Sequence, residues 1–178
     1  MKLNSIAFVS VAAALIAGCS TQDDAWEAKR KAAVERPRTL VYNTDGCDML
    51  YWPSNLPVTV ENFTGRRLKD VLGTHINTVS YCPQSAGFGH FTCAKAGEPL
   101  TGTVPHPNGG CYNSLTKFME IGTDALQMAT EFCATNNLEV FVSIRVNDQH
   151  DASSKPGKLS ALFPPFKQRH PECLMGTL

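Results

Sequence analysis

The sequence predicts an α/β fold with about three N-terminal parallel strands and their crossover helices. Two observations predict it. Between Thr39 and Ile144, short runs of strand-forming residues alternate with segments whose apolar residues recur at helical spacing. In addition, polar residues gather where the expected strands end, and parallel-sheet folds keep their binding sites at those carboxyl ends.

Three segments have the composition of strands: residues 39–43, 76–81 and 138–144. Side chains alternate between the two faces of a strand. The third strand therefore has one apolar face, formed by Val140, Val142 and Ile144, which suits packing on helices. Its other face becomes polar towards the end and consists of Phe141, Ser143, Arg145 and Asn147. The first strand likewise places Val41, Asn43 and Asp45 on one face.

Two helices are expected between these strands. The first begins with Thr59 as its N-cap and ends at Gly73, because a hydroxyl can accept a backbone N–H there and glycine favours helix ends. The second runs from the N-cap Thr123 to Asn136-Asn137. Its buried stripe is Ala125, Leu126, Met128, Ala129, Phe132 and Cys133. Residues 82–112 are expected to form a long loop, which indicates a functional segment or an element without a clear pattern.

Residues 1–18 have the pattern of a lipoprotein signal peptide. Lys2 precedes an apolar run that is too short to span a bilayer comfortably and that ends in Leu15-Ile16-Ala17-Gly18-Cys19. This run resembles the bacterial lipobox, in which a cysteine thiolate receives a diacylglycerol before cleavage. We expect a mature chain that begins at Cys19 and is held to a membrane by lipid; an uncleaved anchor is the alternative. By similarity to known sorting rules, Ser20 favours the outer membrane or cell surface.

The composition limits the kinds of segment, partner and cofactor that we expect. Residues 19–38 contain few large apolar residues and are expected to form a polar tether to a domain over residues 39–178. The chain has 16 basic and 16 acidic residues without a large basic run, so nucleic acid is not an expected partner.

Six of the seven cysteines remain besides Cys19. One or two bridges within the loop from Cys82 to Cys111 and a set of buried or partly exposed free thiols both remain open. The cysteine spacing matches no zinc motif, and no cofactor is expected.

Several segments, taken in order, resemble the N-terminal part of bacterial family-10-like glycosyl hydrolase-like proteins. They are Tyr42-Asn43-Thr44-Asp45-Gly46, Tyr81-Cys82 followed by Gly87-Phe88-Gly89, Gly122-Thr123-Asp124-Ala125-Leu126-Gln127, residues 141–151 and Phe166-Lys167-Gln168-Arg169-His170-Pro171-Glu172. The most specific piece is Arg145-x-Asn147-Asp148-x-His150-Asp151. The resemblance covers roughly Thr39 to Gly176, and members of this family are predicted (β/α)8-barrel enzymes that are often exported.

The resemblance implies that the α/β fold is a partial (β/α)8 TIM barrel with a carbohydrate site at its mouth. Its substrate-binding residues would be Asp45, Arg145, Asn147 and His150. Carboxylate, amide and guanidinium groups bind sugar hydroxyls, and glycoside hydrolysis usually needs two carboxyl groups. Asp148 and Asp151 are the catalytic candidates by residue type, although their proximity in one loop also suits binding.

Other interpretations of this cluster stay open. Arg145 pairing with Asp45 or Asp148 would satisfy buried charges without any ligand. Asp148 and Asp151 would then cap the loop, and His150 would be a hydrogen-bonded loop residue. A metal site from Asp148, His150 and Asp151 has no recognised spacing, and we do not expect one.

The length limits the functional expectation. A complete barrel takes about 250 residues, whereas residues 39–178 suffice for three strands and their crossovers. We expect the N-terminal fragment of an exported, lipid-anchored glycoside-hydrolase-like protein that acts on or binds carbohydrate. A truncated inactive relic is a second account. The third is a non-catalytic lipoprotein that binds glycans or a protein partner through a small open α/β domain. The sequence contains no signal for an oligomeric state.

The intact mass of the protein extracted from membranes tests the anchor. A lipid-modified species that begins at Cys19 and ends at Leu178 would confirm the anchor and favour the binding or relic role. A substantially heavier lipidated product, as the fragment interpretation predicts, would mean that the sequence is part of a longer chain. An unlipidated mass with residues 1–18 still attached would contradict the lipoprotein interpretation.

Overall fold

The computed structural model describes residues 23–84, 90–94, 98–99, 111–146, 148–160 and 162–174. The chain divides into two compact units, residues 1–38 and residues 39–178. The expected signal peptide and Cys19 lie outside the described residues. In the first unit, residues 23–35 are helical and exposed, with ion pairs one turn apart between Glu27 and Arg30 and between Lys31 and Glu35. Within the described ranges, no helix is long and apolar enough to cross a membrane.

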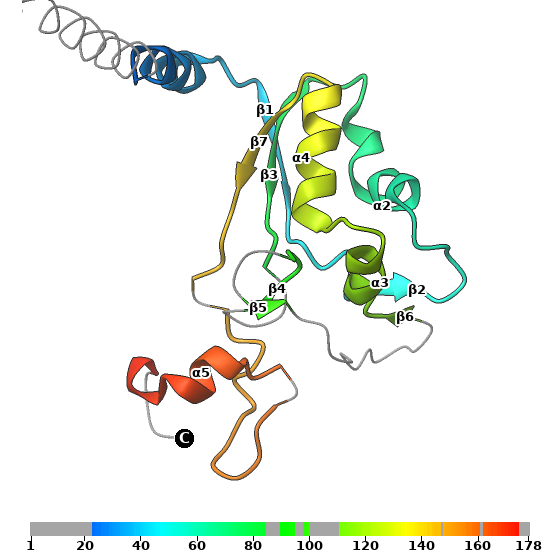
Figure 1. Ribbon diagram of the computed structural model, residues 1–178, viewed down its shortest axis with the longest axis vertical. Coiled ribbons are helices and arrows are strands. Elements are labelled where there is room, and N and C mark those ends of the chain that lie inside the picture. Colours follow the sequence, from blue (N-terminus) through cyan, green and yellow to red (C-terminus); the bar gives the residue numbers. More distant parts are fainter. Residues whose placement is uncertain are drawn as a thin grey trace, which may run out of the picture. The chain divides into compact units, whose positions relative to one another are not determined.

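The second unit is built on a three-stranded parallel sheet (Figure 1). Its strands are β1 (Leu40–Thr44), β3 (Ile76–Tyr81) and β7 (Glu139–Val142), in the order β1-β3-β7. The crossovers contain helix α2 (Val60–Arg67) with the 3-10 turn η1 (Lys69–Val71), and helices α3 (Leu115–Glu120) and α4 (Ala125–Thr135). The predicted α/β class with a parallel sheet is thereby confirmed.

The expected helices form with small shifts in their ends. Thr59 caps α2 as predicted, since its Oγ1 accepts the N–H of Asn62 at 3.1 Å. The helix stops at Arg67 rather than Gly73, and the chain continues as the tighter turn η1. For α4 the predicted N-cap Thr123 is wrong by one residue. Asp124 takes that place, with Oδ1 accepting the N–H of Gln127 at 2.8 Å.

The loop predicted over residues 82–112 contains short strands in its described parts. Strand β2 (Trp52–Pro53) pairs antiparallel with β6 (Cys111–Tyr112), and β4 (His90–Phe91) pairs parallel with β5 (Glu98–Pro99). Near the C-terminus, helix α5 (Pro165–Arg169) is followed by the 3-10 turn η2 (Pro171–Cys173). Two-residue strands have no periodic pattern, so the sequence gives no signal for them.

The hydrophobic core lies between one face of the sheet and the helices. Val79 and Tyr81 of β3 are buried against Phe63 of α2 and Phe118 of α3. The Phe63 ring meets Tyr81 and Phe118 edge-on, with centroids 6.4 and 6.1 Å apart. The predicted stripe of α4 is confirmed, since all six of its residues are buried or packed on this core. Helices α2 and α4 both lie on this side of the sheet (Figure 1).

Beyond the strand ends, β1 and β3 stay close together. The N–H of Cys82 donates to the carbonyl of Thr44 at 3.2 Å. Gly46 follows with a φ of +72°, and a Cβ at this position would lie 1.6 Å from the carbonyl oxygen of Cys82. Only glycine has both the left-handed backbone and the missing side chain that this approach needs. The approach directs the chain after β1, including Asp45, across the carboxyl end of β3.

Replacing Gly46 tests this close approach. We expect Gly46→Ala to lower the free energy of unfolding by about 3 kcal/mol or more, because the new Cβ collides with backbone that cannot easily move. Urea unfolding measures the loss. The matched control is Gly73→Ala, which has a φ of +74° but no atom within 4 Å of its Cβ position. It should lose only about 1 kcal/mol from backbone strain. Equal losses in the two variants would contradict the account.

Candidate functional site

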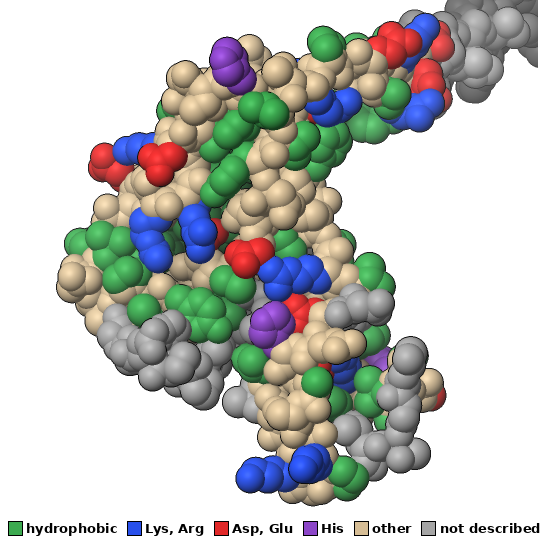
Figure 2. Space-filling view, turned by 180° about the vertical axis from the view of Figure 1, so that it is seen from behind, with side chains coloured by type: hydrophobic (Ala, Val, Ile, Leu, Met, Phe, Trp, Pro, Cys, Tyr) green, Lys and Arg blue, Asp and Glu red, His purple; other side chains and the backbone are tan. Residues whose placement is uncertain are grey.

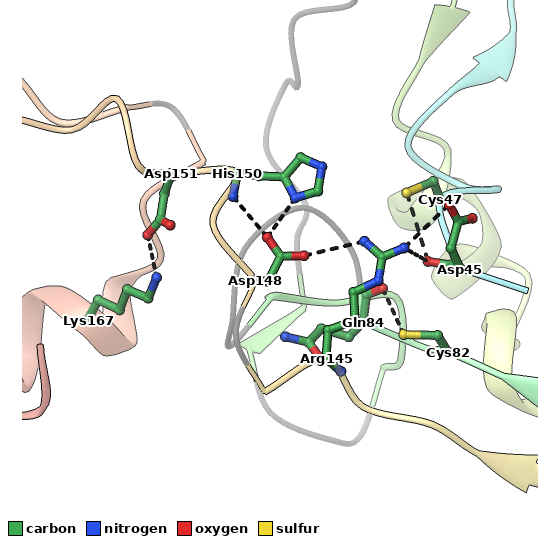
Figure 3. Close-up of polar contacts among 9 residues, drawn as sticks. All are labelled: Asp45, Cys47, Cys82, Gln84, Arg145, Asp148, His150, Asp151 and Lys167. Atoms are coloured by element: carbon green, nitrogen blue, oxygen red, sulfur yellow. Dashed lines mark hydrogen bonds and ion pairs between the residues drawn. The ribbon is translucent and has the colours of Figure 1, made fainter. Parts of the chain in front are cut away.

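The segments that follow β1, β3 and β7 meet at Arg145 (Figure 3). The Nη2 atom of Arg145 lies 3.3 Å from Oδ2 of Asp45 and donates to the Asp45 carbonyl, also at 3.3 Å. The backbone N–H of Arg145 donates to Oε1 of the buried Gln84 at 2.7 Å. Residues from all three strand ends are thus joined at one edge of the sheet, as the sequence predicts for Asp45 and Arg145.

Asp148 holds the other side of this cluster. Its Oδ2 lies 3.4 Å from Nη1 of Arg145, and its Oδ1 accepts the backbone N–H of His150 at 3.0 Å. The Nδ1 atom of His150 lies 2.6 Å from the same Oδ1. The Asp148 side chain is only 1% exposed, so its carboxylate is buried beneath the more exposed Arg145 and His150 and orients both through hydrogen bonds. The geometry therefore favours a positioning role for Asp148.

The protonation of Asp148 follows from these contacts. Burial of the carboxyl raises its pKa, but the hydrogen bonds from the backbone and ring of His150 and from Arg145 lower it more. The resulting pKa of Asp148 lies below the ordinary aspartate value, so the group is ionised at neutral pH. An ionised carboxylate only accepts hydrogen bonds, and the nearby His150 nitrogen is therefore the donor.

Three side chains of the cluster face solvent. The exposed fractions are 57% for Asp45, 52% for His150 and 31% for Arg145. In Figure 2, acidic, basic and histidine side chains lie next to one another across the face shown. Together they offer a carboxylate acceptor, a planar guanidinium donor and an imidazole within one small area. This combination suits a ligand with several neighbouring hydroxyl groups.

Asp151 lies apart from this cluster. Its Oδ2 accepts from Nζ of Lys167 on α5 at 2.6 Å, and both side chains are largely buried. Figure 3 shows the Asp151 carboxylate directed towards Lys167 and away from Arg145. The contact ties the 148–154 turn to α5. Asn147, the remaining predicted binding residue, lies outside the described residues.

Two polar residues near this edge escape prediction. Gln84 follows the end of β3 by three residues, and the buried Asp48 lies three residues after Asp45. Arg67 of α2 contacts Asp48 in an ion pair. Burial raises the pKa of Asp48 by more than Arg67 lowers it, so the net shift is upward. Their position after strand ends is the signal that could have identified both residues.

The alternatives to a ligand site can now be compared with the contacts. Arg145 does pair with both Asp45 and Asp148, as charge compensation requires. Charge compensation explains the contact with the buried Asp148. It does not explain why Asp45 and His150 are held in the cluster, because exposed side chains do not need a partner to offset the cost of burial. In the part of the chain that the structure describes, no group of three His, Cys, Asp or Glu residues is arranged to hold a metal ion.

The opposite pKa shifts of Asp148 and Asp48 predict opposite pH effects. Asp148, with a lowered pKa, stabilises the fold above its unfolded pKa near 3.8 and loses this contribution as pH falls through the folded pKa. Asp48, with a raised pKa, stabilises below 3.8 and loses this contribution as pH rises through its folded pKa.

Urea unfolding from neutral pH to about pH 3 would measure both effects. The stability advantage of the natural chain over Asp148→Asn should shrink as pH falls below 3.8. Its advantage over Asp48→Asn should instead grow as pH falls from neutral towards 3.8. If both differences moved in the same direction, the assigned shifts would be wrong.

Comparison with known proteins adds no relative. No protein-family model matches the chain, and no match was found among curated proteins or solved structures. The likeness to family-10-like glycosyl hydrolase-like proteins therefore stays a prediction from the motifs. The fold class and the arrangement around Arg145 rest on the geometry described above.

Proposed function

We propose that this protein is an exported, lipid-anchored, glycoside-hydrolase-like protein that binds carbohydrate through Asp45, Arg145 and His150. One observation supports this most. Asp45 and Arg145 are 100 residues apart in the sequence, yet they meet at the carboxyl edge of a parallel sheet with exposed polar groups. Ligands of α/β proteins bind at this edge.

The strand order supports a barrel as the wider architecture. In a (β/α)8 barrel each strand pairs with the next strand of the chain, and the helices cover the outer face. The strands β1, β3 and β7 pair in chain order, and the described helices α2 and α4 share one face. A doubly wound sheet would instead reverse its order and place helices on both faces.

The fixed guanidinium explains how a weakly binding ligand would be held. The Arg145 side chain is restrained by Asp45 and Asp148, and Gln84 holds the backbone N–H of the same residue, so little rotamer freedom would be lost on binding. Hydroxyl groups on adjacent sugar carbons would accept from Arg145 and donate to Asp45. The exposed His150 ring would border the same ligand, because Asp148 holds His150 beside Arg145.

The carboxyl groups favour binding over turnover. Asp148 is buried against Arg145 and His150, and Asp151 is paired with Lys167. Neither has the open approach to substrate that an acid or nucleophile needs. Hydrolysis is the second candidate, favoured by the opposite pKa shifts of Asp48 and Asp148 at one sheet edge.

Polysaccharide binding by the purified mature chain tests the proposal, with cellulose, xylan, chitin and starch as probes. Asp45→Asn should weaken binding about 10-fold, because a charged acceptor is worth about 1.5–3 kcal/mol when it is hydrogen-bonded. Arg145→Ala should weaken binding further, because it removes the guanidinium that pairs with both Asp45 and Asp148. The control Asp70→Asn changes an exposed aspartate of η1 and should bind like the natural chain.

The outcomes separate the two candidates. Binding that is lost in Asp45→Asn and occurs without release of reducing sugar supports a glycan-binding protein. Release of reducing sugar that disappears in Asp48→Asn or Asp148→Asn supports the hydrolase. Binding that is equal in Asp45→Asn, Arg145→Ala and the control would show that this edge is not the carbohydrate site.

A further inference from the structure

We propose that Cys82 and Cys93 form a disulfide in the exported protein. Both cysteines are buried thiols in the structure, and they lie where the chain returns to the end of β3 after residues outside the described set. The proposal rests on export to an oxidising compartment, since disulfides persist there. It does not depend on carbohydrate binding.

A pair of hydrogen bonds holds the two cysteine-bearing segments side by side. The N–H and the Oγ1 of Thr92 both donate to the carbonyl of Pro83, at 2.6 and 2.8 Å. Cys82 and Cys93 are the outward neighbours of this pair, one on each segment. Each cysteine is one residue away from this contact, and Cys82 is close enough to Cys93 to contribute to the raised pKa of its thiol. Disulfides need Cα atoms about 4.4–6.8 Å apart, so this placement suits a bridge.

The returning segment, residues 92–94, is held in position by the start of α4. The carbonyl of Thr92 accepts the N–H of Ala125 at 3.2 Å, and the N–H of Ala94 donates to Oδ2 of Asp124 at 2.8 Å. Cys93 lies between these two anchored residues and therefore has little freedom to leave Cys82. A bridge at this point would join the end of β3 to the segment that rests on the start of α4.

Electrostatics agree with this neighbourhood. Burial raises the pKa of the Cys93 thiol to about 12, with smaller contributions in the same direction from the nearby Asp124 and Cys82. Such a thiol stays protonated and unreactive once it is buried. Oxidation therefore takes place while the segment is still open, and the resulting uncharged bridge is well suited to the buried position.

Three of the other cysteines are placed less favourably, and Cys111 lies in β6, which pairs with β2. Cys133 is fully buried in the core on α4, and Cys173 is exposed in η2. Cys47 is the nearest competitor, because the preceding Gly46 touches the Cys82 carbonyl. However, the two sulfurs are directed at different carbonyls, which does not favour a bridge between them. The Cys82 sulfur lies 3.4 Å from the carbonyl of Gln84, and the Cys47 sulfur lies 3.9 Å from that of Asp45 (Figure 3).

The reaction is a thiol–disulfide exchange. One cysteine thiolate attacks a disulfide of the compartment, such as oxidised glutathione, and one glutathione leaves as a thiol. The second cysteine then attacks the mixed disulfide and releases the second glutathione. The two cysteines lose two electrons and two protons in total, and the glutathione disulfide is reduced by those electrons to two thiols.

Trypsin provides a direct test on the purified full chain, refolded from urea in a glutathione redox buffer and alkylated under denaturing conditions. Cleavage after Lys69 and Lys95 leaves both cysteines in one peptide, residues 70–95. The expected result is this peptide without alkyl groups and lighter by two hydrogens. Alkylation of both cysteines, or a link to the Cys47 peptide of residues 39–66, would overturn the proposal. The buffer supplies the oxidant, so this result does not depend on export.

Melting experiments with single and double variants test whether the bridge stabilises the fold. Dithiothreitol should lower the melting temperature of the natural chain by about 6–12 °C, as expected for closure of a short loop. Cys82→Ala, Cys93→Ala and the double variant should melt alike and should not respond to dithiothreitol. Cys173→Ala, the exposed control, should respond like the natural chain. Additive losses in the double variant, or equal melting of the natural chain with and without dithiothreitol, would contradict the bridge.

Discussion

The close approach of Gly46 to the Cys82 carbonyl is the constraint on which the edge of this sheet depends. Parallel strands bring their carboxyl ends to one side, but the chain must still leave each strand without blocking its neighbour. Gly46 allows the chain after β1 to pass directly over the end of β3. Asp45 and Asp48 are placed on either side of this crossing, and both take part in ion pairs with residues from distant parts of the chain.

The two ion-pair groups at this edge differ in their exposure. Arg145 stands between an exposed carboxylate and a buried one, so it is fixed and still reachable from solvent. Asp48 is enclosed and pairs with Arg67 behind the edge. A charge that is held in place and half-open suits recognition, because its hydrogen-bonding geometry exists before any ligand arrives. A closed pair mainly compensates the cost of burying charge.

Part of this arrangement can be predicted from the sequence, and the reasons are local. Strand Ile76–Tyr81 and the start of α2 at Thr59 follow from composition and capping, which act over a few residues. Thr123 and Asp124 are both good caps, so the sequence does not decide between them. The meeting of Asp45 and Arg145 follows from the rule for parallel strands. The pairs Asp48–Arg67 and Asp151–Lys167 do not, because each depends on how a helix packs.

Asp124 couples the opening of two segments that are distant in the sequence, the start of α4 and the segment of residues 92–94. One carboxylate oxygen accepts from the first turn of α4 and the other from Ala94. Neither contact can be lost by rotation of this side chain without disturbing the other, so the start of the helix and the returning segment form a single cooperative unit. In hydrogen exchange, the amides of Gln127 and Ala94 would then open to solvent together, at a rate set by the weaker of the two segments.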